Sequence, residues 1–250
     1  MNSVFRFRPY KKSSCPAPEL TFGTFVVGDS NREAFSAANS VLTSPGSFLV
    51  LCGGSGVGKT HLLHAIHNGL LAQNPAAVTK HMNADQFTAY LIHSIRTGNP
   101  EPFREECETV DVLLVDDVQY LSGKERTQEE FFRFLKTRVQ TNRLTVLTLD
   151  SAFEDAQSIE NSLRSFFPGI VWSAVNEPDY EVRASIVRAK AAELELRLSD
   201  EEIELIAKNV PGDLRTAFGV LKRISLYDSF PETFPDAPSI SEIIRDALPN

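Results

Sequence analysis

The sequence is poor in cysteine and contains no long hydrophobic run. Its three cysteines, Cys15, Cys52 and Cys107, lie far apart in the chain and form no C-x-x-C pair. An odd number of cysteines without a disulfide pattern is typical of a reducing compartment. No apolar run approaches the roughly 18 residues that a membrane-spanning helix needs, and no signal peptide is recognisable. We therefore expect a cytoplasmic protein that makes no contact with a membrane.

Positive charge is also scarce. The chain has 25 Lys and Arg residues against 33 Asp and Glu residues, which gives a formal net charge of −8. This balance argues against a protein whose whole surface wraps duplex DNA. The N-terminus is an exception, because FRFRPYKK (residues 5–12) is basic and aromatic. We expect residues 1–19 to form a flexible basic tail, and a docking segment for nucleic acid or a partner is the alternative.

Short apolar runs recur along the first two thirds of the chain, without alternating polar residues. They cover residues 48–52, 110–115, 144–149 and 169–175. Runs of this kind predict strands that are buried on both faces of a parallel sheet. Amphipathic helical patterns lie between them, so the sequence predicts an α/β domain over residues 20–177.

The pattern changes at Pro178, after which helical patterns follow one another. They predict a small all-helical lid subdomain over residues 178–228. Residues 229–250 are predicted to be a Pro-rich link followed by a last short strand or helix.

The segment GGSGVGKT fits the phosphate-loop pattern G-x-x-x-x-G-K-[ST], and it lies between a predicted strand and a predicted helix. Its glycines allow backbone N–H groups to surround an anion, Lys59 supplies charge to the β- and γ-phosphates, and Thr60 offers a hydroxyl to Mg²⁺. We therefore expect ATP or ADP as the cofactor, together with Mg²⁺. The candidate nucleotide-binding residues are Gly53, Gly54, Ser55, Gly56, Val57, Gly58, Lys59, Thr60, His61 and Arg215.

Acidic residues follow two of the predicted strands, at the sheet edge where open α/β sheets bind ligands. Asp116 and Asp117 end VDVLLVDD, and Asp150 ends LTVLTLD. We expect Asp116 to hold Mg²⁺ with Thr60, and Asp117 to orient or deprotonate the attacking water. Asp150 would face the γ-phosphate if its strand lies beside the phosphate loop. Arg215 in GDLRTAFG would reach phosphate from the lid.

Together these motifs resemble the AAA+ module of the bacterial replication initiator DnaA family, from about Leu20 to Leu248. The segments GGSGVGKTHLLHAI, VDVLLVDDVQYL and KERTQEEFF are similar to family signatures, and LTFGTFVVGDSNREAFSAA resembles the segment that wraps the adenine. The resemblance implies a P-loop AAA+ parallel sheet flanked by helices and followed by a helical lid. It also implies that Asp150 is the sensor 1 residue and that Arg215 is the sensor 2 residue.

The resemblance further implies a contact with single-stranded DNA. ADQFTAYLIHSI is similar to a helix of the initiator-specific insertion, where Thr88 matches a position implicated in that contact. Lys124 and Arg126 match two others. Two cations in a polar loop provide a weak, salt-dependent grip on phosphates, so we expect weak binding unless neighbouring subunits repeat it.

The sequence departs from the family in SIENSLRSFF (residues 158–167). Family members carry two arginines here, one of which reaches a neighbour's γ-phosphate, but this chain has Ser162 and Phe166 at those positions, with Arg164 between them. Because Phe cannot stabilise developing negative charge, the departure implies a weak ATPase without efficient self-stimulated hydrolysis. A second departure is that no duplex-reading domain follows Leu248, so we expect no sequence-specific binding of duplex DNA.

We consequently expect an ATP- or ADP-binding protein of the DnaA type, acting in the initiation or regulation of DNA replication. Nucleotide state would control its assembly with itself or with an initiator. A short regulator similar to Hda, a helicase loader or transposase helper, a small-molecule kinase, and a module that holds nucleotide without catalysis are alternatives. DDVQYL and KERTQEEFF favour the initiator type over the loader.

Overall fold

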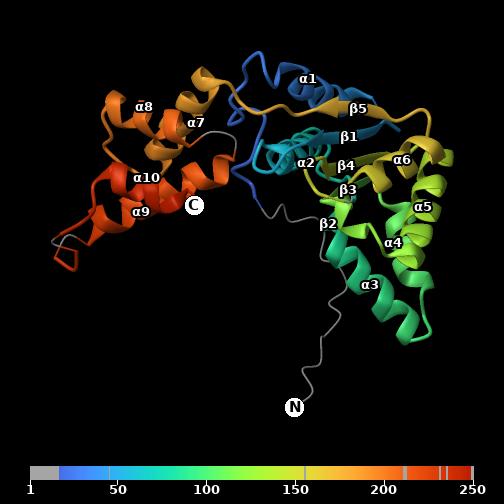
Figure 1. The fold of residues 1–250 in the computed structure, drawn as a ribbon. Coiled ribbons are helices and arrows are strands. Elements are labelled where there is room, and N and C mark those ends of the chain that lie inside the picture. Colours follow the sequence, from blue (N-terminus) through green and yellow to red (C-terminus); the bar gives the residue numbers. More distant parts are fainter. Residues whose placement is uncertain are drawn as a thin grey trace.

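The computed structural model describes residues 17–44, 46–154, 156–210, 213–230, 232–234 and 236–248. Most of the predicted basic tail, with Cys15, lies outside the described residues. The described part consists of a sheet domain with helices on both faces, followed by a separate group of helices (Figure 1).

The sheet has five parallel strands in the order β2-β3-β4-β1-β5. Four of them fall within the apolar runs, which confirms the predicted parallel α/β sheet. β2 was not expected from the sequence, because it includes the charged Lys80. This residue is buried at the sheet edge, where its Nζ lies 2.5 Å from Glu106 Oε1. The strands are β1 (Phe48–Gly53), β2 (Thr79–Asn83), β3 (Val112–Asp116), β4 (Leu144–Asp150) and β5 (Val171–Ala174).

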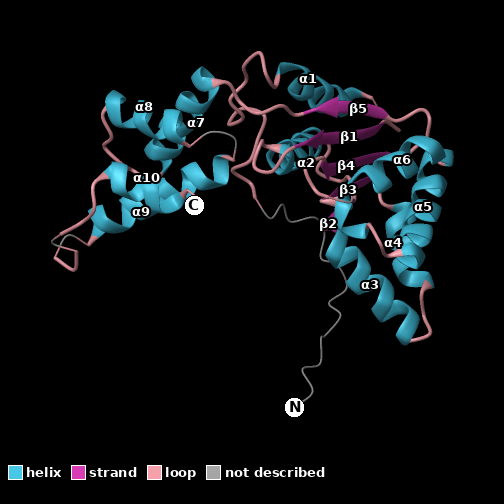
Figure 2. Cartoon of the chain, viewed as in Figure 1, coloured by secondary structure: helices cyan, strands magenta, loops and turns pink. Residues whose placement is uncertain are grey.

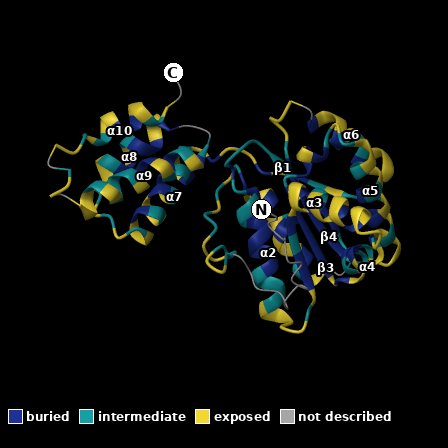
Figure 3. Cartoon of the chain, turned by 90° about the horizontal axis from the view of Figure 1, so that it is seen from below, coloured by how far each residue is buried: buried dark blue, intermediate teal, exposed yellow. Residues whose placement is uncertain are grey.

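Side chains that alternate along the strands build one hydrophobic core on each face of the sheet. On β3, Val112 and Leu114 pack with α1 and α2, whereas Leu113 and Val115 pack with α3 to α6. Figure 3 shows the buried strands β3 and β4 between their flanking helices. The helices of this domain are α1 (Arg32–Ser40), η1 (Val41–Thr43), α2 (Lys59–Gln73), α3 (Ala84–Arg96), α4 (Glu101–Thr109), η2 (Val118–Leu121), α5 (Glu125–Gln140) and α6 (Ala156–Phe166).

The described regular elements after β5 are all helices, which are joined by loops (Figure 2). The last element, for which the sequence allowed a strand or a helix, is a helix that begins with a capping box between Ser239 and Glu242. These helices form a core of their own, which includes Val187, Ile206 and Val220. They are α7 (Tyr180–Glu193), α8 (Asp200–Asn209), α9 (Leu214–Ser229) and α10 (Ile240–Ala247). No described helix has the length and apolar character needed to cross a membrane.

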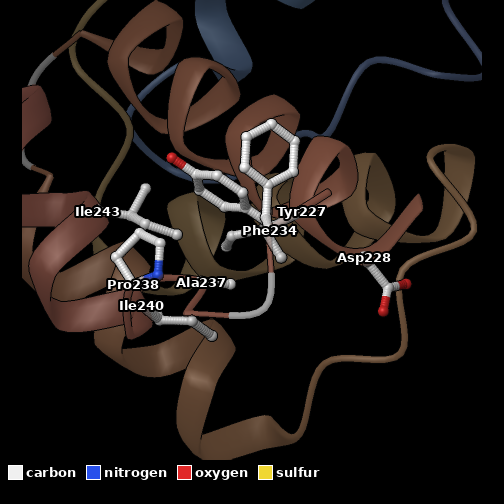
Figure 4. A pocket seen from close by; sticks show the side chains of 8 residues that line it. Tyr227, Asp228, Phe234, Ala237, Pro238, Ile240 and Ile243 are labelled. Carbon is white, nitrogen blue, oxygen red and sulfur yellow. The ribbon is translucent and has the colours of Figure 1, made fainter. Parts of the chain in front are cut away.

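A cavity of about 380 Å³ lies within this helical group, where α9, α10 and the segment between them meet. Figure 4 shows the ring of Tyr227 close to Phe234 in its lining, while the carboxylate of Asp228 points away from the apolar side chains. None of the candidate site residues lines this cavity, so it is separate from the site described below.

Candidate nucleotide-binding site

The candidate site lies at the carboxyl ends of β1, β3 and β4. β1 pairs with β4 along its whole length, and Asp150 is opposite Gly53 at the end of that ladder. The strand that ends in Asp150 therefore lies beside the phosphate loop, which was the condition for Asp150 to face the γ-phosphate. β3 lies on the other side of β4, which brings Asp116 to the same edge.

The phosphate loop has a backbone that glycine makes possible. Gly56 and Gly58 have φ values of 68° and 107°, which residues with a side chain rarely adopt. Gly58 is the N-cap of α2, and no side chain caps this helix end. Its first N–H groups are thus available to an anion, which is the arrangement of a phosphate site. On this ground the loop fits the phosphates of a nucleotide.

Lys59 is directed back onto its own loop. Its Nζ donates to Gly53 O at 3.0 Å and Gly54 O at 2.5 Å, and it lies 3.7 Å from Asp150 Oδ2. Only 6% of its side chain is exposed. Burial lowers the pKa of this ammonium group, while nearby carboxylates, Asp150 first, oppose the shift. The loop carbonyls and Asp150 keep the buried charge satisfied.

The two acids after β3 have different surroundings. Asp116 is buried and accepts hydrogen bonds from Thr60 Oγ1, at 2.9 Å, and from Thr148 Oγ1. Thr60 and Asp116, the two expected Mg²⁺ ligands, are thus in direct contact. Asp117 has a φ of 58°, and its backbone N–H donates to Thr148 Oγ1 at 2.8 Å. Burial and the neighbouring Asp116 raise the pKa of the Asp117 carboxyl group.

Gln119 connects the acids of the two strands and was missed by the sequence analysis. Its Nε2 donates to Asp117 Oδ1 at 3.1 Å, and its Oε1 accepts from the backbone N–H of Asp150 at 2.9 Å. The side chain is 2% exposed. The only signal in the sequence was its place two residues after Asp117.

The helical group reaches the phosphate loop at the start of α9. Arg215 Nη1 donates to Ser55 Oγ at 3.0 Å, so this arginine of the lid lies at the phosphate loop. Asp213 is close to the same loop and was not foreseen as part of the site. Ser55 Oγ donates to its Oδ2 at 3.5 Å.

His61 ties the segment before α1 to the helix that follows the phosphate loop. Its Nε2 donates to Thr21 O at 2.9 Å, and its ring meets the Phe25 ring edge-on at a centroid distance of 5.1 Å. Asn68 Nδ2 donates to Leu20 O at 2.8 Å. Residues of the segment expected to wrap the adenine are therefore fixed along α2, beside the phosphate loop.

The residues expected to contact DNA occupy neighbouring elements on another part of the domain. Lys124 Nζ lies 3.2 Å from Asp85 Oδ1 of α3, whereas Arg126 is exposed in the first turn of α5. Thr88 is half-buried, and its Oγ1 donates to Ala84 O of its own helix. The pairing with Asp85 partly neutralises Lys124. The surface that Thr88, Lys124 and Arg126 form therefore has less positive charge than the sequence suggested.

The residues at the arginine positions of the family all lie on α6. Phe166 is 64% exposed and packs on Phe132 with ring centroids 5.2 Å apart. Ser162 Oγ donates to Ser158 O of the preceding turn. Arg164 forms an ion pair with Glu160 at 2.9 Å. The exposed side chain at the second arginine position, Phe166, is thus apolar, while the exposed Arg164 is paired within its own helix.

Comparison with known proteins agrees with this geometry. The family model of the bacterial DnaA ATPase domain matches residues 17–172. Domain III of the Thermotoga maritima replication initiation protein DnaA has a TM-score of 0.80 and 31% identity, covering 93% of this chain and 98% of that chain. A replication initiator DnaA bound to AMPPCP and single-stranded DNA has a TM-score of 0.73 and 32% identity, covering 87% and 69%. AMPPCP-bound DnaA from Aquifex aeolicus has a TM-score of 0.74 and 33% identity, covering 84% and 66%.

Proposed function

The chain belongs to the bacterial DnaA ATPase domain family, and from this premise we propose that it binds ATP or ADP with Mg²⁺ in DNA replication. The nucleotide would lie between the α/β domain of residues 20–177 and the helical lid of residues 178–228. The observation that carries the proposal is the meeting of Lys59, Thr60 and Asp116 at one sheet edge, with Arg215 facing the same loop. Two relatives with about a third of their residues identical are bound to AMPPCP, which supports a triphosphate ligand.

The proposed roles follow from the chemistry of the side chains. Lys59 and the N–H groups from Gly54 to His61 bind phosphate oxygens, and Lys59 exchanges the loop carbonyls for them. Thr60 and Asp116 hold Mg²⁺, which supplies charge neutralisation at the phosphates when bound. Arg215 adds a charged hydrogen bond from the lid. His61 and the segment packed on it form one wall for the base.

Asp117 is the proposed general base or orienting group for water. Burial and Asp116 raise the pKa of its carboxyl group, which shifts it toward the range in which it accepts a proton more readily. Gln119 holds its side chain, and Asp150 lies beside Lys59. These residues supply hydrolytic chemistry within one subunit.

The surface of α6 favours a nucleotide-controlled assembly with slow turnover. An arginine from a neighbouring subunit accelerates hydrolysis in related P-loop enzymes by about 10³- to 10⁵-fold. Phe166 offers an apolar ring in its place. The bound nucleotide would then set the position of the lid and control binding to another copy or to an initiator. The second candidate is a regulator of the Hda or helicase-loader kind that binds nucleotide with little hydrolysis. The loss of the arginine favours slow hydrolysis, but Phe166 counts against the role of Hda itself, because that role uses the arginine that Phe166 replaces.

Weak binding of single-stranded DNA is a further part of the proposal. The relative bound to AMPPCP and single-stranded DNA supports it, together with the exposed Arg126. Thr88 and Lys124 would complete the contact after Lys124 leaves Asp85. Binding should weaken steeply with salt, because it depends on few phosphate contacts.

Calorimetric titration of the purified chain with MgADP and Mg-AMPPCP tests the proposal. We expect saturable binding of one nucleotide per chain, and its loss in Lys59→Ala. Lys124→Ala is the matched control, because it removes a lysine that lies far from the phosphate loop in sequence and pairs with Asp85. Absence of binding in the unaltered chain, or unchanged binding in Lys59→Ala, would contradict the proposed site.

A further inference from the structure

An acidic side chain of the lid lies against the phosphate loop. Asp213 Oδ1 accepts a hydrogen bond from the backbone N–H of Arg215 at 2.8 Å, and this makes Asp213 the N-cap of α9. Its other oxygen, Oδ2, accepts from Ser55 Oγ of the loop at 3.5 Å. One carboxylate therefore starts a lid helix and contacts the loop expected to bind phosphate.

The fit between Asp213 and the loop is close. A Cβ atom added at Gly56 would lie 1.8 Å from Asp213 Oδ1 and 3.1 Å from the backbone nitrogen of Leu214. The start of α9 thus occupies the space beside Gly56 that a side chain would otherwise fill. Together with the bond from Arg215 to Ser55, this makes a contact between the lid and the tip of the loop.

Asp213 and Arg215 have opposite charges and touch the same serine. A phosphate bound in the loop attracts the guanidinium group and repels the carboxylate, and both effects are strong in a partly dehydrated site. The carboxylate is half-buried, so solvent screens it only in part. Arrival of phosphate therefore favours the bonds of Arg215 and opposes those of Asp213.

We infer that Asp213 acts as a latch between the lid and the phosphate loop. Without nucleotide it holds the lid on the loop, and the phosphates of a bound nucleotide must displace it. This inference rests on the proposed nucleotide binding. It adds that Asp213 helps to set the nucleotide affinity and the position of the lid. Asp213 competes with phosphate for Ser55 and the adjoining loop, whereas Arg215 cooperates with it. The latch acts more strongly against a triphosphate than against a diphosphate, because the triphosphate brings more negative charge.

Asp213→Asn removes the charge and keeps the helix cap, because Asn and Asp cap helices about equally well. We expect this variant to bind Mg-AMPPCP about tenfold more tightly and MgADP about threefold more tightly, from the loss of one nearby like charge. The gain should shrink when the salt concentration rises.

Asp179→Asn is the matched control. Asp179 is the N-cap of α7, the first lid helix, and accepts from Val182 N at 2.9 Å in the same manner. It has no hydrogen bond to the phosphate loop among the described residues. We expect both nucleotide affinities of this variant to match those of the unaltered chain.

Hydrogen exchange without nucleotide provides a readout that is independent of binding. We expect amides of the loop around Ser55 and Gly56 to exchange faster in Asp213→Asn than in the unaltered chain, because the lid contact is weakened. Asp179→Asn should leave them unchanged. Exchange that is equal in all three proteins would overturn the latch.

The binding results separate the inference from the function on which it rests. If the unaltered chain binds no nucleotide, the proposed function fails. If it binds nucleotide and Asp213→Asn binds equally or more weakly, the proposed function stands and the latch is wrong. Tighter binding in Asp213→Asn with a larger gain for Mg-AMPPCP supports the latch.

Discussion

The guanidinium group of Arg164 lies over the ring of Trp172, with its carbon 3.9 Å from the ring centroid. The same side chain forms an ion pair with Glu160 one turn earlier on α6. Arg164 is therefore engaged within its own subunit by a cation–π contact and a charge pair. The neighbouring Phe166 packs on α5 through Phe132. The half-exposed Arg164 would therefore have to leave Trp172 and Glu160 before it could act on another subunit.

Turnover of ATP per molecule should accordingly stay flat as the protein concentration rises. Arg164 is held by Glu160 and Trp172, and Phe166 carries no charge, so association of subunits adds no charge stabilisation while these contacts persist. Turnover measured over a wide range of concentration, with Lys59→Ala as the blank, checks this. A steep rise that disappears in Arg164→Ala would show that Arg164 leaves Trp172 and acts in a neighbour's site.

Gln119→Ala should slow ATP turnover by about tenfold and change nucleotide affinity less than threefold. The amide positions Asp117, and its other hydrogen bond is with the backbone N–H of Asp150 and not with the Asp150 carboxylate. Single-turnover assays and titration with MgADP separate the two effects. Gln128→Ala is the control, since this amide of the first turn of α5 donates to Leu121 O at the end of η2 and has no hydrogen bond to Asp117 or Asp150 among the described residues. Equal losses in both variants would point to a general structural effect.

Arg138→Met should lower the free energy of unfolding by about 3–5 kcal/mol, because each buried acceptor left without a donor costs about 1–3 kcal/mol. The guanidinium group is fully buried and donates to backbone carbonyls that include those of Cys107, Val110 and Leu144, and the substitution leaves them without partners. Urea unfolding monitored by circular dichroism measures the change. Arg133→Met, which removes an exposed arginine of the same helix paired with Glu130, should change stability by less than about 0.5 kcal/mol.

Stability should fall as the pH is lowered from about 6.5 toward 4, in part through His81. Burial, followed by His64 and His67, lowers the pKa of His81 to about 4 in the folded chain, whereas the unfolded chain takes up its proton near pH 6.5. The stabilisation is complete above pH 6.5 and is lost as the pH falls to about 4. The loss from His81 amounts to about 2.5 kcal/mol between neutral pH and pH 4.5.

Urea midpoints at pH 7 and pH 4.5 test this contribution. His81→Gln should lose less stability between the two pH values than the unaltered chain does. His93→Gln, an exposed position on α3, should retain the full pH dependence. Identical pH profiles for all three proteins would contradict the assignment to His81.

Local patterns predicted the parts of the fold that depend on neighbouring residues. Apolar runs marked β1, β3, β4 and β5, and the spacing of glycines, Lys59 and Thr60 marked the phosphate loop. The proximity of Asp116 and Asp150 followed because the carboxyl ends of parallel strands meet at one edge.

The parts that depend on distant contacts could not be predicted in this way. β2 has a polar sequence that becomes buried through the ion pair of Lys80 with Glu106. Arg138 lies within a charged helix and resembles a surface residue until β4 and the end of α4 surround it. The contact between Ser55 and Asp213 joins residues 158 positions apart, and it depends on how the lid lies on the sheet domain.

The core of the lid helices has a thermodynamic consequence. Its members, such as Val187, Ile206, Val220 and Ile244, come from α7 to α10 and the segments between them, and none comes from the sheet domain among the described residues. Such a group can melt as a cooperative unit with a free energy of its own. A calorimetric scan without ligand would then show two overlapping transitions. A ligand that contacts both the sheet domain and the lid would merge the two transitions into one. The shape of the heat-capacity peak therefore reports whether the lid is bound to the sheet domain.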